Sequence, residues 1–122
     1  MQQPKRALVV DSNAGSRELI RILLEHEGFQ TTEARDSLEA LELASSTSPD
    51  LIMIDLQMPR HEGYSAAQKL RQDGRFKKSM VALTGRELDS DPIQISAAGF
   101  TTYIPKPIVL QGLHDRLAQL QF

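Results

Sequence analysis

A chain of 122 residues, 40% of them apolar, is long enough for one domain with a single core. The absence of cysteine excludes disulfides and thiolate metal sites, and a net charge of −2 with scattered basic residues argues against a nucleic-acid surface. No apolar run has membrane-spanning length, and the N-terminus lacks the apolar region of a signal peptide. We therefore expect one cytoplasmic domain over residues 1–122, with a core from about residue 6 to residue 121, and no membrane or nucleic-acid partner.

The first predicted strand is the apolar run 7–10, which ends at an aspartate. Asp11 and the two residues after it, Ser12 and Asn13, favour loops and helix caps. A helix is expected from about Ala14 to Glu27. Its buried face is predicted from the helical spacing of four aliphatic residues: Leu19, Ile20, Leu23 and Leu24.

The second strand and helix are less apolar than the first. Residues 29–33 are partly polar, which places this strand at an edge of the sheet. Asp36 and Glu39 have the spacing of a capping box for the helix that follows. We expect residues 45–50 to form a polar loop that leads into the third strand.

The stretch 51–63 is the centre of the chain. Its first four residues, Leu51 to Ile54, are too few for a buried helix and predict a strand covered on both faces, as in a parallel sheet. Asp55 follows where this strand should end, and a carboxylate beside an apolar run is costly unless it is solvated, paired or near a metal. This stretch by itself allows a loop cap or a functional acid. Gly63 is expected to allow a sharp turn into the next element.

The second half of the chain repeats the alternation. The expected elements are a helix, a strand, a short helix, a strand and a last helix, over 64–72, 79–83, 92–99, 101–104 and from 108 onward. Pro92 suits the first turn of its helix, capped by Ser90 or Asp91. The last helix has a predicted buried stripe of leucines: Leu110, Leu113, Leu117 and Leu120. The chain ends with this helix, so we expect no attached effector domain.

Five alternations of strand and helix predict an α/β fold, a doubly wound parallel sheet with right-handed crossovers and helices on both faces. The carboxyl ends of all strands in such a sheet lie along one edge, where ligands bind. Four polar residues directly follow or end apolar strands at this edge: Asp11, Asp55, Thr84 and Lys106. Core packing does not explain this convergence, so the sequence predicts a functional site at this edge.

These residues lie in motifs that resemble those of response-regulator receiver domains of two-component, or phosphorelay, signalling. The motifs are Val-Val-Asp-Ser-Asn, Met-Ile-Asp-Leu-Gln-Met-Pro-Arg-His-Glu-Gly, Ala-Leu-Thr-Gly and Tyr-Ile-Pro-Lys-Pro. Their order and spacing match the family from about residue 7 to residue 120. The resemblance implies a flavodoxin-like (βα)5 receiver fold with strand order 2-1-3-4-5. It also implies a regulatory domain that catalyses only its own phosphorylation and dephosphorylation.

The resemblance further implies that Asp55 takes a phosphoryl group from a partner histidine kinase or phosphotransfer protein. A carboxylate suits this role because the acyl phosphate is labile, which makes the signal reversible. The implied cofactor is Mg²⁺ or Mn²⁺, bound by Asp11, Asp55 and the backbone carbonyl of Gln57. The side chains of Gln57 and Arg86 occupy positions where family members tune the lifetime of the phosphoryl group.

Two further residues are implied to bind the phosphoryl oxygens, Thr84 through its hydroxyl and Lys106 through its charge. Gly85 leaves the space that the incoming group needs. Tyr103 matches the family's switch aromatic: when Thr84 moves toward the phosphoryl group, the ring turns inward. This movement changes the face formed by the fourth helix, fifth strand and fifth helix, which a downstream protein would recognise and which is a candidate homodimer interface.

Ser12 departs from the family pattern, because the family usually has an acidic pair here and only Asp11 remains. Serine is a neutral ligand with a short reach, so we expect it to bind the metal weakly or through water and to lower the Mg²⁺ affinity. Ser12 also supports an alternative function, a phosphorylation-independent pseudo-receiver that acts as an interaction module. A phosphohydrolase with an aspartyl nucleophile would need a second carboxylate near Asp55, and Gln57 cannot serve as one.

Overall fold

A computed structural model describes residues 4–85 and 91–120, and its centre is a five-stranded parallel sheet. The strands are β1 (Arg6–Val10), β2 (Gln30–Ala34), β3 (Leu51–Asp55), β4 (Ser79–Thr84) and β5 (Thr102–Pro105). They lie in the order β2-β1-β3-β4-β5, and every neighbouring pair is parallel. The predicted fold class and strand order are therefore confirmed, including the edge position of β2.

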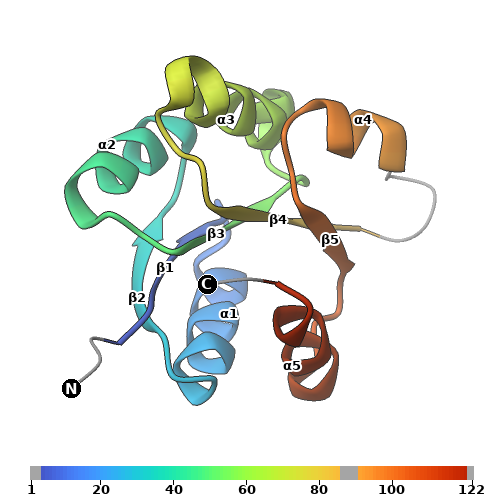
Figure 1. Cartoon of the computed structure of the whole chain (residues 1–122). Helices are drawn as coiled ribbons and strands as arrows, with labels where there is room; N and C mark the ends of the chain where they lie inside the picture. The colour runs from blue at the N-terminus through green and yellow to red at the C-terminus, as the bar shows by residue number, and fades with distance from the viewer. Residues whose placement is uncertain (1–3, 86–90, 121–122) are drawn as a thin grey trace.

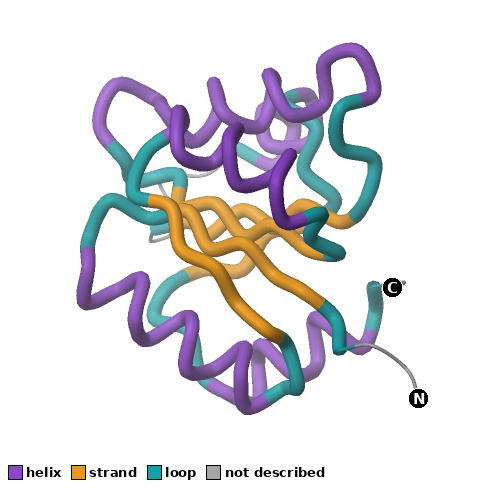
Figure 2. The backbone as a smooth tube through the Cα atoms, turned by 90° about the vertical axis from the view of Figure 1, so that its left-hand side faces the viewer, coloured by secondary structure: helices purple, strands orange, loops and turns teal. Residues whose placement is uncertain are grey.

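Helices cover both faces of this sheet. They are α1 (Ala14–His26), α2 (Ser37–Thr47), α3 (Glu62–Arg71), α4 (Pro92–Ala97) and α5 (Leu110–Ala118), with short 3-10 turns at Pro59–His61 and Gln72–Gly74. Figure 1 shows α2, α3 and α4 on one face and α1 and α5 on the other. The perpendicular view in Figure 2 shows the twisted sheet between these two helical layers. Within the described residues, no helix is both long and apolar enough to cross a membrane.

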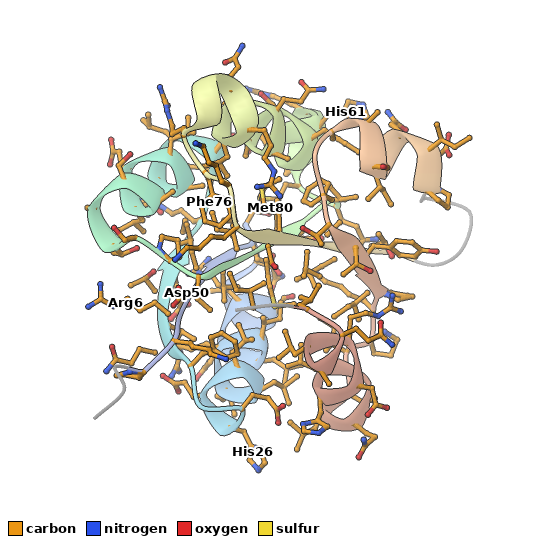
Figure 3. All side chains as sticks on the ribbon, viewed as in Figure 1. Arg6, His26, Asp50, His61, Phe76 and Met80 are labelled. Carbon is orange, nitrogen blue, oxygen red and sulfur yellow. The ribbon has the colours of Figure 1, made fainter. Side chains whose placement is uncertain are left out.

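Side chains of the central strands alternate between two buried clusters, one on each face of the sheet. The cluster under α2, α3 and α4 includes Leu8, Val10, Ile52, Ile54 and the residues Phe76 and Met80 labelled in Figure 3. The cluster against α1 and α5 includes Ala7, Val9, Leu51 and Met53. All five residues of β3 are buried, which explains its uninterrupted apolar run: both of its faces are covered.

Two predicted helical faces differ from the observed ones. On α1, Ile20 and Leu24 are buried, but Leu19 is 50% exposed, because it lies at the flank of the contact stripe where a cavity opens toward the β5–α5 loop. On α5, Leu113 and Leu117 form the buried stripe. Leu110 is half-buried, and Leu120, which follows the end of α5 at Ala118, is half-buried against the same cluster.

Helix boundaries also differ from the prediction. Residues 45–47 belong to α2 rather than to a loop, and α2 ends where Ser48 adopts a left-handed conformation with φ 49°. The α4 helix ends at Ala97 and is capped by Asp91, whose side chain accepts a hydrogen bond from the Ile93 amide. The alternative cap, Ser90, lies outside the described residues.

Gly63 is needed for a different reason from the predicted one. It lies inside α3, and a Cβ atom at this position would lie 2.7 Å from the backbone oxygen of Asp55. The sharp turn is made by Arg60 and His61, which have φ values of 59° and 56°. Gly63 therefore lets α3 approach the end of β3 closely, at Asp55.

Candidate functional site

The sheet brings together the four polar residues predicted to meet at its carboxyl edge. Asp55 and Thr84 end neighbouring strands, and Asp11 and Lys106 directly follow β1 and β5. The backbone N–H of Lys106 donates to the carbonyl of Thr84 at 2.8 Å, which fixes the loop after β5. From there the Lys106 Nζ reaches Oδ2 of both aspartates, at 3.4 Å from Asp11 and 3.3 Å from Asp55.

Both carboxylates are buried and share a single positive charge. Asp11 is 0% exposed and Asp55 is 4% exposed, and burying a carboxylate is costly unless it is paired. Burial raises the pKa of Asp55 above its ordinary value, and the neighbouring Asp11 carboxylate raises it further. The backbone N–H of Gln57, which donates to Asp55 Oδ1 at 2.9 Å, and the Lys106 ammonium partly oppose this shift.

The Asp11 carboxylate is held by a closed set of hydrogen bonds with the start of α1. Its Oδ1 accepts from the backbone N–H of Asn13 at 2.9 Å, and the Asn13 side chain caps α1 by accepting from the Ser16 N–H at 2.8 Å. The Ser16 hydroxyl then donates to Asp11 Oδ2 at 2.6 Å. Sequence reasoning missed Ser16. The available signal was Asn13 as a helix cap, because such a cap turns the third helical residue back toward the loop.

The backbone of Asp11 is also fixed from the side of β2. The Arg17 guanidinium donates to the carbonyl oxygen of Asp11 at 2.9 Å, and it also pairs with the Glu33 carboxylate at 2.9 Å. The loop after β1 is therefore held by both α1 and β2.

The Thr84 hydroxyl has an unusual environment. Among the side chains of residues 4–85 and 91–120, its Oγ1 is the buried polar atom without a hydrogen-bond partner. An unsatisfied buried hydroxyl costs about 1–3 kcal/mol. The Thr84 backbone lies next to the end of β3 and its carbonyl accepts from the Lys106 amide, so this unpaired donor belongs to the same edge of the sheet.

A cavity of about 380 Å³ opens beside the Lys106 amine. Its lining includes the polar residues Ser16 and Gln57, together with Gly85, Leu19 and Ile108. The cavity therefore adjoins the side of the site formed by Lys106 and Ser16.

The other predicted site residues lie around this centre. Ser12 is exposed, next to Asp11, and the side chain of Gln57 is exposed as well. Tyr103 pairs with Ala82 in the sheet and is half-buried, with the Arg116 guanidinium 6.0 Å from its ring centre. Arg86 lies outside the described residues.

The residues present fit a hard divalent cation with few protein ligands. In the described part of the chain, no three His, Cys, Asp or Glu side chains cluster as a metal site. The oxygen donors that the structure brings together are the two carboxylates, those of Asp11 and Asp55. Mg²⁺ suits such a set, because it prefers oxygen ligands and usually keeps several waters.

Comparison with known proteins identifies the relatives of this chain. The family model of the response regulator receiver domain matches residues 7–118. The response regulator MprA of Mycobacterium sp. (strain KMS) is 36% identical over 117 residues, which are 96% of this chain and 50% of MprA. The chain thus spans about half the length of the MprA relatives. The polar-differentiation response regulator DivK of Brucella anthropi is 35% identical over 106 residues, 86% of each chain.

Solved structures of similar proteins have the same fold. The CheY-like response regulator receiver domain of Methylobacillus flagellatus has a TM-score of 0.85 and 27% identity, covering 98% of this chain and 100% of its own. The receiver domain of the sensor histidine kinase PA1611 of Pseudomonas aeruginosa PAO1 has a TM-score of 0.84 and 27% identity, covering 97% and 98%. That domain was solved with a magnesium ion coordinated in its active site cleft.

Proposed function

The chain belongs to the response regulator receiver domains of two-component signalling, and from this premise we propose that Asp55 accepts a phosphoryl group in a magnesium-dependent reaction. The donor is a phosphohistidine of a partner histidine kinase or phosphotransfer protein. The observation that carries the proposal is the convergence of two buried carboxylates on the Lys106 amine, within 3.4 Å. The buried Thr84 hydroxyl at the end of the neighbouring strand, which has no partner in the described part of the chain, supports it. A regulatory domain of this kind modifies itself and passes the change on to another protein.

Asp55 is placed to act as the nucleophile. Its Oδ1 accepts a hydrogen bond from the backbone N–H of Gln57, and its Oδ2 lies 3.3 Å from Lys106 Nζ. In the transfer, a bond forms between an Asp55 oxygen and phosphorus while the phosphorus–nitrogen bond of the donor breaks. The electron pair of that bond leaves with the imidazole. The aspartyl phosphate is labile, so the modification is reversible.

Lys106 and Thr84 provide the charge and the hydrogen bond that the transferred group requires. The Lys106 ammonium already lies next to the attacking oxygen and pairs with a phosphoryl oxygen as a point charge. The Thr84 hydroxyl donates to a second phosphoryl oxygen, which satisfies a group that has no partner among the described residues.

Magnesium would be held by Asp11, Asp55 and the backbone carbonyl of Gln57, with Ser12 contributing weakly or through water. The bound ion supplies positive charge that offsets the charge on the phosphoryl oxygens. Ser12 adds no charge of its own, so the affinity for Mg²⁺ is lower than in a receiver domain that has a second acid at this position, next to Asp11. The magnesium-bound PA1611 domain, which has the same fold, supports this assignment.

Tyr103 would transmit the change to the surface. The ring is half-buried on β5 and packs against the cluster under α4, close to Thr84 along the neighbouring strand. When Thr84 moves toward the phosphoryl group, the ring turns into the space that is released. The α4–β5–α5 face then changes shape, and a downstream protein or a second copy of the chain binds it.

Acetyl phosphate and Mg²⁺ provide the test. We expect the wild-type protein to gain one phosphate on Asp55, detected by prompt intact-mass analysis and by mapping after borohydride reduction. The Asp55→Asn variant and a sample with excess chelator should gain none. A folded wild-type protein without an adduct would favour the pseudo-receiver, the alternative that Ser12 supports. Sustained hydrolysis of unrelated phosphate esters would favour a phosphohydrolase.

A further inference from the structure

The side chains of Asp11, Ser16 and Lys106 form one hydrogen-bonded cluster, here called the Ser16 latch. The Ser16 hydroxyl donates to Asp11 Oδ2 at 2.6 Å and accepts from Lys106 Nζ at 3.0 Å. Lys106 Nζ also lies 3.4 Å from the same Asp11 oxygen. The first distance is in the short range typical of a hydroxyl bonded to a carboxylate. The hydroxyl therefore links a carboxylate and an ammonium that are 95 residues apart in the chain.

The position of the Ser16 hydroxyl is set by the backbone around it. Ser16 lies in the first turn of α1, and its amide is bonded to the side chain of the capping residue Asn13. The Asn13 amide in turn holds the other oxygen of Asp11. This closed ring leaves the hydroxyl little freedom to turn away from Asp11.

The latch uses the acceptor capacity of the Asp11 oxygen that faces the site. A carboxylate oxygen has about two acceptor positions, and Oδ2 of Asp11 already faces both Ser16 Oγ and Lys106 Nζ. A cation that uses this oxygen, directly or through a water, must displace one of them. Ser16 thus stabilises the state in which the lysine, not a metal ion, neutralises Asp11.

We infer that Ser16 is a positioning residue that holds Lys106 on Asp11 in the metal-free site and so raises the Mg²⁺ concentration at which the site fills. The inference rests on the proposed function and adds a regulation of the same site. It also accounts for how the buried Asp11 carboxylate remains paired without a metal ion. Ser12 contributes no acid, so Asp11 and Asp55 are the two carboxylates to be neutralised, and the latched Lys106 contacts both of them.

A magnesium titration of matched serine variants tests this effect. Ser16→Ala removes the hydroxyl, Ser16→Thr retains one, and Ser46→Ala makes the same substitution at an exposed position of α2. Thermal unfolding first establishes that each variant is folded. The Kd is measured from the amide signals of Asn13 and Gln57 in NMR spectra. We expect Ser16→Ala to bind Mg²⁺ about ten- to a hundredfold more tightly, because a hydrogen bond to a charged group is removed from the competing state.

The two controls define which result would overturn the inference. Ser16→Thr and Ser46→Ala are expected to bind Mg²⁺ as the wild type does. An unchanged or weaker affinity in Ser16→Ala would show that the hydroxyl does not hold back the metal. Tighter binding in Ser46→Ala as well would show a general effect of serine removal.

A second measurement tests the latch without any metal. The Lys106 ammonium gives a distinct ¹H–¹⁵N signal in the cold when its hydrogens are hydrogen-bonded. We expect this signal in the wild type and in Ser16→Thr, with hydrogen exchange several-fold faster in Ser16→Ala. An equal exchange rate in all three proteins would refute the latch. If the wild type binds no Mg²⁺ and takes up no phosphate, the proposed function fails, and the ammonium signal still decides whether the latch exists.

Discussion

Charged residues lie at both the amino and the carboxyl ends of the strands, and the partners of these residues differ between the two ends. At the amino end, Asp50 accepts from the Arg6 amide at 3.0 Å and from Lys78 Nζ at 2.9 Å. Figure 3 shows Arg6 and Asp50 close together. The Arg71 guanidinium nearby donates to three backbone carbonyls, those of Phe76, Lys78 and Gly99. The polar groups at this end have protein partners and are partly open to water.

At the carboxyl end, the carboxylates are more deeply buried, and two of them share one cation. Asp11 and Asp55 share one lysine at distances of 3.3–3.4 Å, longer than the Asp50–Lys78 contact, and the Thr84 hydroxyl has no partner among the described residues. We therefore expect the polar groups at the amino end to contribute to stability and those at the carboxyl end to lower it. Substitutions at matched positions can test this difference.

The largest difference in stability is expected between substitutions of Lys106, at the carboxyl end, and Lys78, at the amino end. Lys106→Met leaves two buried carboxylates without a positive charge and should reduce the free energy of unfolding at pH 7 by about 3 kcal/mol. Lys78→Met removes a shorter ion pair, but its lysine is 60% exposed, so the loss should be below about 1 kcal/mol. Urea unfolding of the two variants and the wild type measures both values. Equal losses would contradict the proposed difference between the ends.

Replacing the two threonines near opposite ends of β4, Thr84 and Thr101, should change the stability of the protein in opposite directions. Thr84→Val replaces an unsatisfied hydroxyl with a methyl group of similar size and should stabilise the protein by about 1 kcal/mol. Thr101 Oγ1 accepts from the Met80 amide at 3.0 Å, so Thr101→Val should destabilise by about 1 kcal/mol. Thermal unfolding checks both signs. A destabilised Thr84→Val variant would show that its hydroxyl is satisfied in the free protein.

Adding an acid at the carboxyl end of the sheet should raise the affinity of the site for Mg²⁺. Ser12→Asp is expected to tighten Mg²⁺ binding about tenfold, because such sites are tuned by the charge of their ligands. Without metal the same variant should be less stable, because it adds a negative charge beside Asp11. Titration calorimetry and thermal unfolding with and without Mg²⁺ measure the two effects. A wild-type Kd as low as that of the variant would refute the weakening attributed to Ser12.

The smallest effects concern the pH dependence of stability at Asp55 and Asp50. Burial raises the pKa of Asp55 above 3.8, so the folded protein binds this proton more tightly than the unfolded chain. Its ionisation costs stability as pH rises through the folded pKa. Asp55→Asn should therefore stabilise the protein at neutral pH, and the gain should disappear in acid.

Asp50 should show the opposite dependence. Its hydrogen bond from Lys78, helped by the Arg6 amide, lowers the pKa of Asp50, so its contribution is present above 3.8 and is lost as pH falls through the lowered folded value. Asp50→Asn should cost less than about 1 kcal/mol at pH 7. Urea unfolding of both Asn variants between about pH 7 and pH 3 gives the two curves. Curves with the same slope would show that the two ends do not differ in this respect.

Much of this architecture could be predicted because it depends on short-range patterns. The apolar runs before Asp11 and Asp55 require buried strands, and alternation with helices requires a parallel sheet. A parallel sheet then places the ends of its strands along one edge. Helix ends were less predictable. Residues 45–47 extend α2 although they are polar, because helix ends depend on capping geometry that sequence signals indicate only loosely.

The sequence by itself determined the fold class and the set of residues at the carboxyl edge, because burial and periodicity are properties of each segment. Only the tertiary structure decided how these residues are bonded. The Ser16 hydroxyl, the space that Gly63 leaves for α3 and the unpaired Thr84 hydroxyl all depend on distances between remote segments. Such distances arise from packing the whole chain, and no local pattern specifies them.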